Sequence, residues 1–178
     1  MDTRAKEIIR EFYGKFYTVA DPTSPVLSLW WDEKMKDKKQ VFQIPGKKWW
    51  VLVTSNGKWG MCRDDRFLAF TSIESVMPLL PLLELSYVDV EELICGGLKR
   101  HKIDIRVMDS FPYEYLLCCA LTWPTDYWTS LALSWLEEGC PTTKEILACL
   151  EVALEKDSLS QKNKHLARKI MRAQRPTE

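Results

Sequence analysis

The chain has 178 residues, which is enough for one domain or for one domain with a small helical extension. Apolar residues make up 46% of it and charged residues 28%, the usual proportions of a globular protein with a buried core. Its 25 basic residues balance its 25 acidic residues, so no overall charge attracts nucleic acid or anionic lipid, although local patches of one sign can exist.

The sequence predicts a cytoplasmic protein. Residues 1–16 carry charges every few positions, which is typical of neither a signal peptide nor a membrane span. The most apolar run, residues 76–83, contains two prolines and is too short to cross a bilayer. The six cysteines form no CxxC pair and show no metal-ligand spacing, so we expect free, mostly buried thiols. A secreted disulfide framework is the less favoured alternative.

An amphipathic helix is predicted for residues 3–19, where apolar side chains such as Ile9 and Phe12 recur at helical spacing. Residues 21–25 contain two prolines, which end this helix and begin a loop. A β-rich region follows. Its strands are expected at residues 26–31, 40–44, 49–54, 58–63 and 66–70.

The best-defined local element is a hairpin formed by the third and fourth of these strands. Asn56 and Gly57 tolerate a positive φ and predict a two-residue turn between the strands. This turn also fixes which residues pair, because side chains alternate between the two faces of a sheet. The pairs expected on one face are Thr54 with Trp59, Leu52 with Met61 and Trp50 with Arg63. The other face, uniformly apolar and therefore expected to be core, holds Trp49, Val51, Val53, Gly60 and Cys62.

Three further elements are predicted before the helical half of the chain. A capping box at residues 71–74 begins a short helix, which two prolines then limit. Residues 89–92 open a second short helix, and Gly96 and Gly97 end it. Residues 102–108 alternate strictly between apolar and charged side chains, which predicts a half-exposed strand.

From Pro112 onward the sequence predicts helices separated by short loops, at residues 113–121 and 124–138, from 142 and from 158. The expected fold class is α+β, with an N-terminal helix and a small antiparallel sheet followed by an antiparallel C-terminal bundle of about four helices. Two parts are expected, an α+β sheet-containing domain at 1–108 and a helical subdomain at 109–178 that packs on it.

No catalytic residue, metal site or cofactor is predicted. The chain lacks the motifs of P-loop, dinucleotide-binding, zinc protease and serine hydrolase sites. Its two histidines, His101 and His165, lie in basic segments and are expected to have surface or structural roles. An enzyme with a cysteine nucleophile at Cys62 or Cys95 is the alternative.

Tryptophan is unusually frequent, with eight residues in the chain. Tryptophan and arginine dominate the energetics of protein interfaces, so the hairpin face that combines them is a candidate partner-binding site. A second packing layer is the simpler interpretation, because large exposed apolar patches are uncommon on monomers. The candidate partner-binding residues are Trp50, Trp59, Met61 and Arg63.

Charge is segregated in the helical half. Residues 113–155 contain seven acidic residues and one basic residue, whereas residues 156–178 contain seven basic and two acidic ones. Packing of the basic last helix against the acidic helices is the favoured interpretation. Contact with nucleic acid or with an acidic partner is the alternative. The residues that would make this contact are Lys162, Lys164, Arg168, Lys169 and Arg172.

The absence of catalytic motifs, the tryptophan-rich sheet and the segregated charge favour a non-catalytic protein–protein interaction module. A bacterial immunity or antitoxin-like inhibitor, or an adaptor, would belong to this class. The alternatives are a nucleic-acid-associated protein that uses the basic last helix, and the cysteine enzyme.

Overall fold

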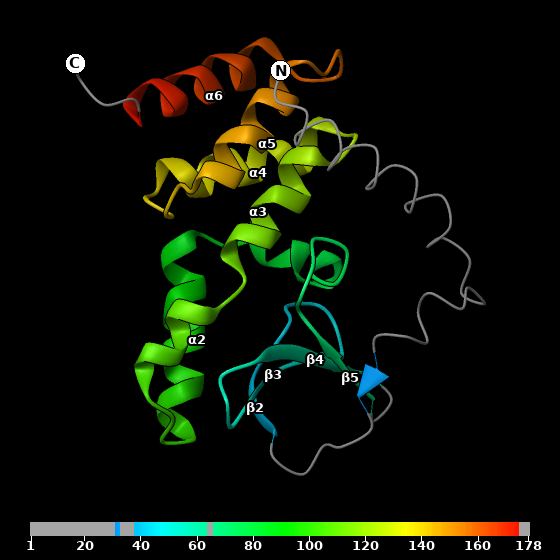
Figure 1. Ribbon diagram of the computed structural model, residues 1–178, viewed down its shortest axis with the longest axis vertical. Coiled ribbons are helices and arrows are strands. Elements are labelled where there is room, and N and C mark those ends of the chain that lie inside the picture. The colour runs from blue at the N-terminus through cyan, green and yellow to red at the C-terminus, as the bar shows by residue number, and fades with distance from the viewer. Residues whose placement is uncertain (1–30, 33–37, 64–65, 175–178) are drawn as a thin grey trace.

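The computed structural model describes residues 31–32, 38–63 and 66–174 (Figure 1). Within these residues a sheet comes first and helices follow, so the predicted α+β class is confirmed. The helix predicted at residues 3–19 lies outside the described residues. The strands are β1 (Trp31–Asp32), β2 (Lys38–Gln43), β3 (Trp50–Thr54), β4 (Trp59–Arg63) and β5 (Arg66–Ala69). The α-helices are α2 (Tyr87–Arg100), α3 (Tyr113–Thr122), α4 (Asp126–Glu137), α5 (Lys144–Leu154) and α6 (Gln161–Ala173), and the 3-10 helices are η2 (Met77–Glu84) and η3 (Ile105–Ser110).

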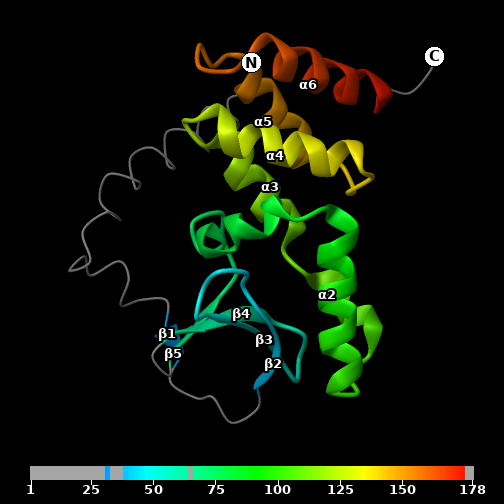
Figure 2. The ribbon, with the colours of Figure 1, turned by 180° about the vertical axis from the view of Figure 1, so that it is seen from behind.

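The five strands are ordered β1-β5-β4-β3-β2, and every neighbouring pair is antiparallel. Strands β2 to β5 therefore form a meander, and β1 pairs with β5 at its edge. The four strands predicted between residues 40 and 70 are confirmed. Figure 2 shows the sheet at one end of the molecule, the helices α3 to α6 stacked at the other, and α2 running beside the sheet next to β2.

The register predicted for the central hairpin is wrong by one residue. Val53 pairs with Trp59, Val51 with Met61 and Trp50 with Cys62. The cause is a three-residue loop, closed by a 2.9 Å hydrogen bond from the Thr54 amide to the Lys58 carbonyl. In this loop only Gly57 has a positive φ, of 78°, as expected when a type I turn is followed by a left-handed residue.

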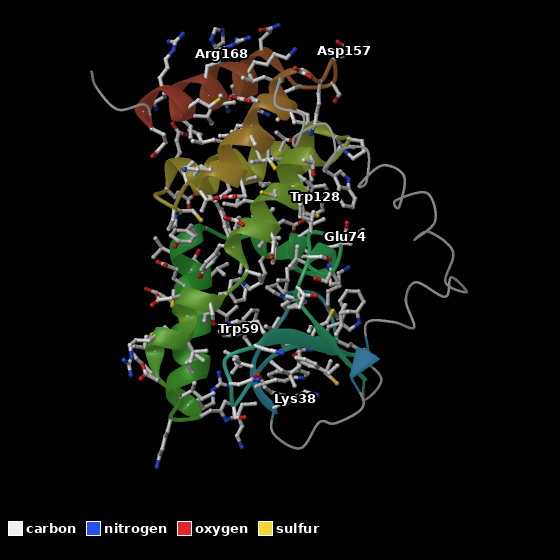
Figure 3. The ribbon with its side chains drawn as sticks, viewed as in Figure 1. Lys38, Trp59, Glu74, Trp128, Asp157 and Arg168 are labelled. Atoms are coloured by element: carbon white, nitrogen blue, oxygen red, sulfur yellow. The ribbon has the colours of Figure 1, made fainter. Side chains whose placement is uncertain are left out.

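The register decides which side chains enter the core. Trp59 and Met61 lie on the core face and are only 3% and 2% exposed. Figure 3 labels Trp59 on the sheet. Trp50 lies on the opposite face and is half-buried. That second face is packed as well, because the Phe67 ring lies over Gly60 and fills the space that a side chain would occupy. Leu52 and Phe67 of this face are buried as well, at 0% and 2% exposure.

Helix α2 continues through Gly96 and Gly97, so the predicted end of this helix is wrong. Gly97 lies directly against β2, and a Cβ built on it would be 2.2 Å from the Val41 carbonyl oxygen. Gly97 thus allows the helix to approach the strand closely, and it does not end the helix. The helix ends after Arg100, where Lys102 has a φ of 55°.

The strand predicted at residues 102–108 is also wrong. A hydrogen bond of 3.0 Å from the Ile103 amide to the Leu98 carbonyl uses the start of this segment to close the end of α2. The Asp104 side chain then accepts a bond from the Arg106 amide and begins η3. The alternating pattern therefore belongs to a helix stop followed by a short 3-10 helix.

Aromatic side chains connect the sheet to the helices. The rings of Trp59 and Phe111 meet edge to face with centroids 5.1 Å apart, and the Phe111 and Tyr113 centroids are 4.7 Å apart. Tyr113 in turn contacts Trp135 of α4, at 6.2 Å. One hydrophobic cluster thus includes residues from both sides of the predicted boundary at residue 108. The helices predicted from residue 113 onward are present as α3 to α6.

A lysine stabilises the C-terminal end of α3. Lys156 donates hydrogen bonds of 2.5 Å to the Leu121 carbonyl and of 2.5 Å to the Trp123 carbonyl, and one of 3.3 Å to the Thr129 hydroxyl. Carbonyls at a helix end have no partner within the helix, so the ammonium supplies one. Burial lowers the pKa of Lys156 to about 8.

The two adjacent glycines of α2 should respond to substitution with opposite signs. Gly97→Ala should destabilise the protein by about 2 kcal/mol or more, because its Cβ would overlap Val41. Gly96→Ala should stabilise it by about 0.5–1 kcal/mol, because no atom lies within 4 Å of its Cβ and alanine favours the helix. Urea unfolding of both variants measures the difference, and equal effects would contradict the packing of α2 on β2.

Lys156→Met should lower the free energy of unfolding at neutral pH by about 1–3 kcal/mol, because two carbonyls lose their partner. The folded amine loses its proton near pH 8, whereas the unfolded amine keeps it to about 10.5. Below pH 8 the buried amine is charged, and its burial lowers the free energy of unfolding. This loss of stability disappears as the pH rises from 8 towards 10.5. Wild type should gain stability relative to Lys156→Met across this interval. The exposed Lys144→Met is the control, and a difference between wild type and Lys156→Met that does not change with pH would refute the assignment.

Candidate functional site

An open groove lies between the outer face of α2 and η3. It consists of two adjoining cavities of about 520 and 430 Å³, which share Glu91, Ile105 and Met108. The larger cavity is also lined by Val88, Glu92, Cys95, Gly96 and Lys99. The smaller one is also lined by Tyr87, Arg106, Asp109, Tyr113 and Pro141.

Helical geometry explains how α2 forms one wall of this groove. Val88, Glu92, Cys95 and Lys99 follow one another at intervals of three or four residues and so share a face of the helix. The opposite face, with Val90, Ile94 and Leu98, is fully buried against the core. The helix therefore presents a separate, partly apolar outer surface.

The groove exposes large apolar side chains. Val88 is 53% exposed and Ile105 is 45% exposed, and both line the larger cavity. In the described part of the chain only Tyr115 and Tyr127 are comparably exposed among large hydrophobic residues, and neither lines the groove. Exposed apolar side chains gathered in one groove are typical of an interaction site.

The η3 wall is fixed to the sheet. The Trp59 indole nitrogen donates bonds of 3.2 Å to the Val107 carbonyl and of 3.2 Å to the Ser110 hydroxyl. The Ser110 hydroxyl lies 2.7 Å from the Val107 carbonyl and 3.1 Å from the Gly57 carbonyl of the hairpin loop, and either carbonyl can accept its proton. The position of Ile105 and Met108 in the groove therefore depends on the central hairpin.

Two tyrosines form the inner end of the smaller cavity. The rings of Tyr87 and Tyr113 meet edge to face with centroids 5.5 Å apart. The Tyr87 hydroxyl donates a 2.7 Å bond to the Glu91 carboxylate, and its backbone amide donates a 2.6 Å bond to the Glu138 carboxylate. The hydroxyl of Tyr113 is different. Among the residues that the structure describes, it is the only buried side-chain oxygen or nitrogen without a hydrogen-bond partner.

Burial raises the pKa of Tyr113 far above its ordinary value, and the neighbouring Tyr87 and Glu91 raise it further. Burial, followed by the hydrogen bond to Glu91, likewise raises the pKa of Tyr87. Both hydroxyls are therefore neutral at physiological pH. The Tyr113 hydroxyl keeps its capacity to donate and to accept a hydrogen bond.

The smaller cavity is acidic. Arg106 donates hydrogen bonds from Nε to Asp104 Oδ1 at 3.1 Å and to Asp104 Oδ2 at 3.0 Å. Its Nη2 donates a further bond of 2.5 Å to Asp104 Oδ2. This contact lowers the pKa of Asp104 to about 2 and balances the charge of Arg106 within the pair. Glu91 and Asp109 are then the remaining charged groups of the smaller cavity. The other base of the groove, Lys99, lies eight residues further along α2 from Glu91.

The structure does not bring the predicted hairpin site together. Trp59 and Met61 are in the core, Trp50 is on the opposite face of the sheet, and the Arg63 side chain lies outside the description. A partner contact at Trp50 stays a prediction.

The five predicted basic residues all lie on α6. Lys169 forms an ion pair of 2.8 Å with Glu137 of α4, as expected if this helix packs on acidic neighbours. Among the described residues, the other four have no ion pair, and Figure 3 shows Arg168 on the side of α6 away from α4 and α5. Contact of Lys162, Lys164, Arg168 and Arg172 with nucleic acid or an acidic partner stays a prediction.

The cysteines divide into two groups. Cys118, Cys119, Cys140 and Cys149 are buried, and burial raises the pKa of Cys140 to about 12. Cys62 and Cys95 are half-buried, and Cys95 lines the groove. Neither histidine lines the groove, and the His101 ring is bonded at 2.7 Å to the Gln40 carbonyl. A cysteine mechanism at Cys62 or Cys95 stays a prediction.

In the described ranges, no three histidine, cysteine, aspartate or glutamate side chains come close enough together to hold a metal ion. No helix in the same part of the chain is both long enough and apolar enough to cross a bilayer. Comparison of the chain with protein-family models, with curated proteins and with solved structures finds no significant match.

The sequence does not predict the groove, because Gly96 and Gly97 indicate a helix end, whereas α2 continues to Arg100. The signal that could have revealed it is the spacing of Val88 and Cys95 along a longer helix, on a different face from Val90 and Ile94. The second wall could not be found this way, because residues 102–108 were predicted as a strand.

The two groove tyrosines should differ in what their hydroxyls contribute to the free protein. Tyr113→Phe should leave stability unchanged or raise it by up to about 1 kcal/mol, because it removes an unpaired buried group. Tyr87→Phe should lower stability by about 1 kcal/mol, because it breaks the bond to Glu91. Urea unfolding compares the two, and a clear loss of stability for Tyr113→Phe would show that its hydroxyl has a partner.

Proposed function

We propose that this protein is a non-catalytic binding module whose α2–η3 groove receives a segment of a protein partner. The observation that carries the proposal is the exposure of Val88 and Ile105 in a groove whose two walls are otherwise anchored in the core. An inhibitor of the immunity or antitoxin type, or an adaptor, in a bacterial cytoplasm, is the biological role that we propose for such a module.

The form of the groove favours a peptide segment over a small molecule. Small-molecule sites enclose most of the surface of their ligand. Here Val88 and Ile105 are each about half exposed, so the groove is too open to enclose a compact ligand. A longer segment can cover the same side chains by lying along α2, as amphipathic segments do in hydrophobic grooves.

The charges favour a segment that is basic as well as apolar. The groove contains three carboxylates, Glu91, Glu92 and Asp109. Against them stand Lys99 and Arg106, and Arg106 is already paired with Asp104. A partner with basic side chains would complement this surface, whereas an acidic partner would be repelled from it.

A phage-displayed library of random peptides, selected on the purified protein, tests this function. Enriched peptides should combine apolar with basic residues. They should bind the double variant Val88→Ser with Ile105→Ser at least about tenfold more weakly, because the exposed apolar area of the groove is removed.

Tyr127→Ser is the matched control, because Tyr127 is as exposed as Val88 but lies outside the groove. It should bind the enriched peptides as wild type does. The proposal fails if no peptide is enriched, if the double variant binds as tightly as wild type, or if the enriched peptides are acidic.

A further inference from the structure

The Tyr113 hydroxyl is a specific feature of the groove that apolar docking does not explain. A buried hydroxyl without a partner destabilises the protein that carries it, so such groups are rare in folded proteins. This one belongs to a residue that lines the smaller cavity together with Glu91, and the Glu91 charge acts on it. An unpaired group at this point can be satisfied by a group that arrives with a ligand.

The charged residues of the smaller cavity determine which charge is favoured for a ligand group that reaches the Tyr113 hydroxyl. Glu91 and Asp109 both line the cavity, and the positive charge of Arg106 is balanced by Asp104. An anion would meet two carboxylates, whereas a cation would be attracted by both. The rings of Tyr87 and Tyr113 add aromatic surface that favours a cationic group.

We propose that the Tyr113 hydroxyl and the Glu91 carboxylate anchor a lysine or arginine side chain of the bound segment. This inference rests on the proposed function and names the part of the partner that enters the smaller cavity. The cation donates one hydrogen bond to the Tyr113 oxygen and another to the Glu91 carboxylate, one oxygen of which already accepts from Tyr87.

The hydroxyl is closed to solvent in the free protein, so a small rearrangement must precede contact. Met108 lines the cavity and has an unbranched, flexible side chain, which changes rotamer readily. A change of rotamer at Met108 alters the shape of this cavity without displacing α2 or η3. The apolar stem of the entering lysine or arginine can then pack against the apolar lining of the cavity.

The anchor can be tested with single amino-acid probes, which need no knowledge of the partner. The probe is N-acetyl-lysine amide, titrated at millimolar concentration into the ¹⁵N-labelled protein and followed by amide chemical shifts. The shifts should cluster around Glu91, Asp109 and Tyr113. N-acetyl-norleucine amide, which has the same stem length without the ammonium, should bind at least about tenfold more weakly.

Two variants and two matched controls assign the contact. Glu91→Gln should weaken the lysine probe by about tenfold and Tyr113→Phe by about threefold or more, because each removes one hydrogen-bonding partner of the cation. Asp89→Asn makes the same charge change at an exposed carboxylate of α2 outside the groove, and Tyr115→Phe removes an exposed hydroxyl outside the groove. Both controls should bind the probe within about twofold of wild type.

Equal binding of the lysine and norleucine probes would overturn the anchor, and so would wild-type affinity in either Glu91→Gln or Tyr113→Phe. These outcomes are distinct from failure of the proposed function. If selected peptides need Val88 and Ile105 but ignore Glu91 and Tyr113, the groove binds a segment and the anchor is wrong. If the lysine probe binds as expected but no peptide is enriched, Glu91 and Tyr113 do bind a cation, and the proposed function is wrong.

Discussion

The close contact between α2 and β2 determines the arrangement of most of the molecule. At Gly97 the helix backbone approaches the Val41 carbonyl so closely that no side chain fits between them. Val41 lies where the pairing of β2 with β3 shifts by one residue, so the strand is irregular at the point that faces the helix. With the helix held there, Val90, Ile94 and Leu98 are completely buried. The outer face of α2 is consequently directed away from the sheet.

The second determinant is the chain of aromatic rings that begins at Trp59. The Trp59 ring contacts Phe111, and the Trp59 indole nitrogen donates a hydrogen bond to Val107 of η3. The Phe111 ring in turn contacts Tyr113. The hairpin, η3 and the start of α3 are therefore positioned by one buried side chain. The groove lies between two elements that are each fixed to the sheet, one through a glycine and one through a tryptophan.

Much of the fold follows from local sequence signals. Thr143 and Ser160 cap α5 and α6 by accepting bonds from Ile146 and Asn163, so the positions of these helices could be read from the sequence. The strands between residues 40 and 70 were predicted for similar reasons. Two of the errors, the end of α2 and the hairpin register, have a common cause. A glycine can mark either a reversal of the chain or a close approach of two backbones, and the sequence alone does not show which of these applies at Gly97. In the same way, Gly57 is compatible with a hairpin loop of either two or three residues.

The candidate site was largely beyond prediction because it depends on these two glycines. A two-residue turn would have placed Trp59 on the opposite face of the sheet, with Leu52, whereas the three-residue loop places it on the face that packs against Phe111. The groove needs a longer α2 and an η3 in place of a strand. The unpaired state of the Tyr113 hydroxyl depends on groups from distant parts of the chain, and no local pattern specifies it.

The two faces of α2 also bear on how such a protein can change over generations. Its inner face is fully buried, whereas Val88, Glu92 and Lys99 of the outer face contribute little to the core. Substitutions on the outer face can therefore change the lining of the proposed binding groove while the fold keeps most of its stability. Gly97 has no such freedom. In the proposed binding module, recognition can diverge quickly on one side of a helix whose other side is held constant by packing.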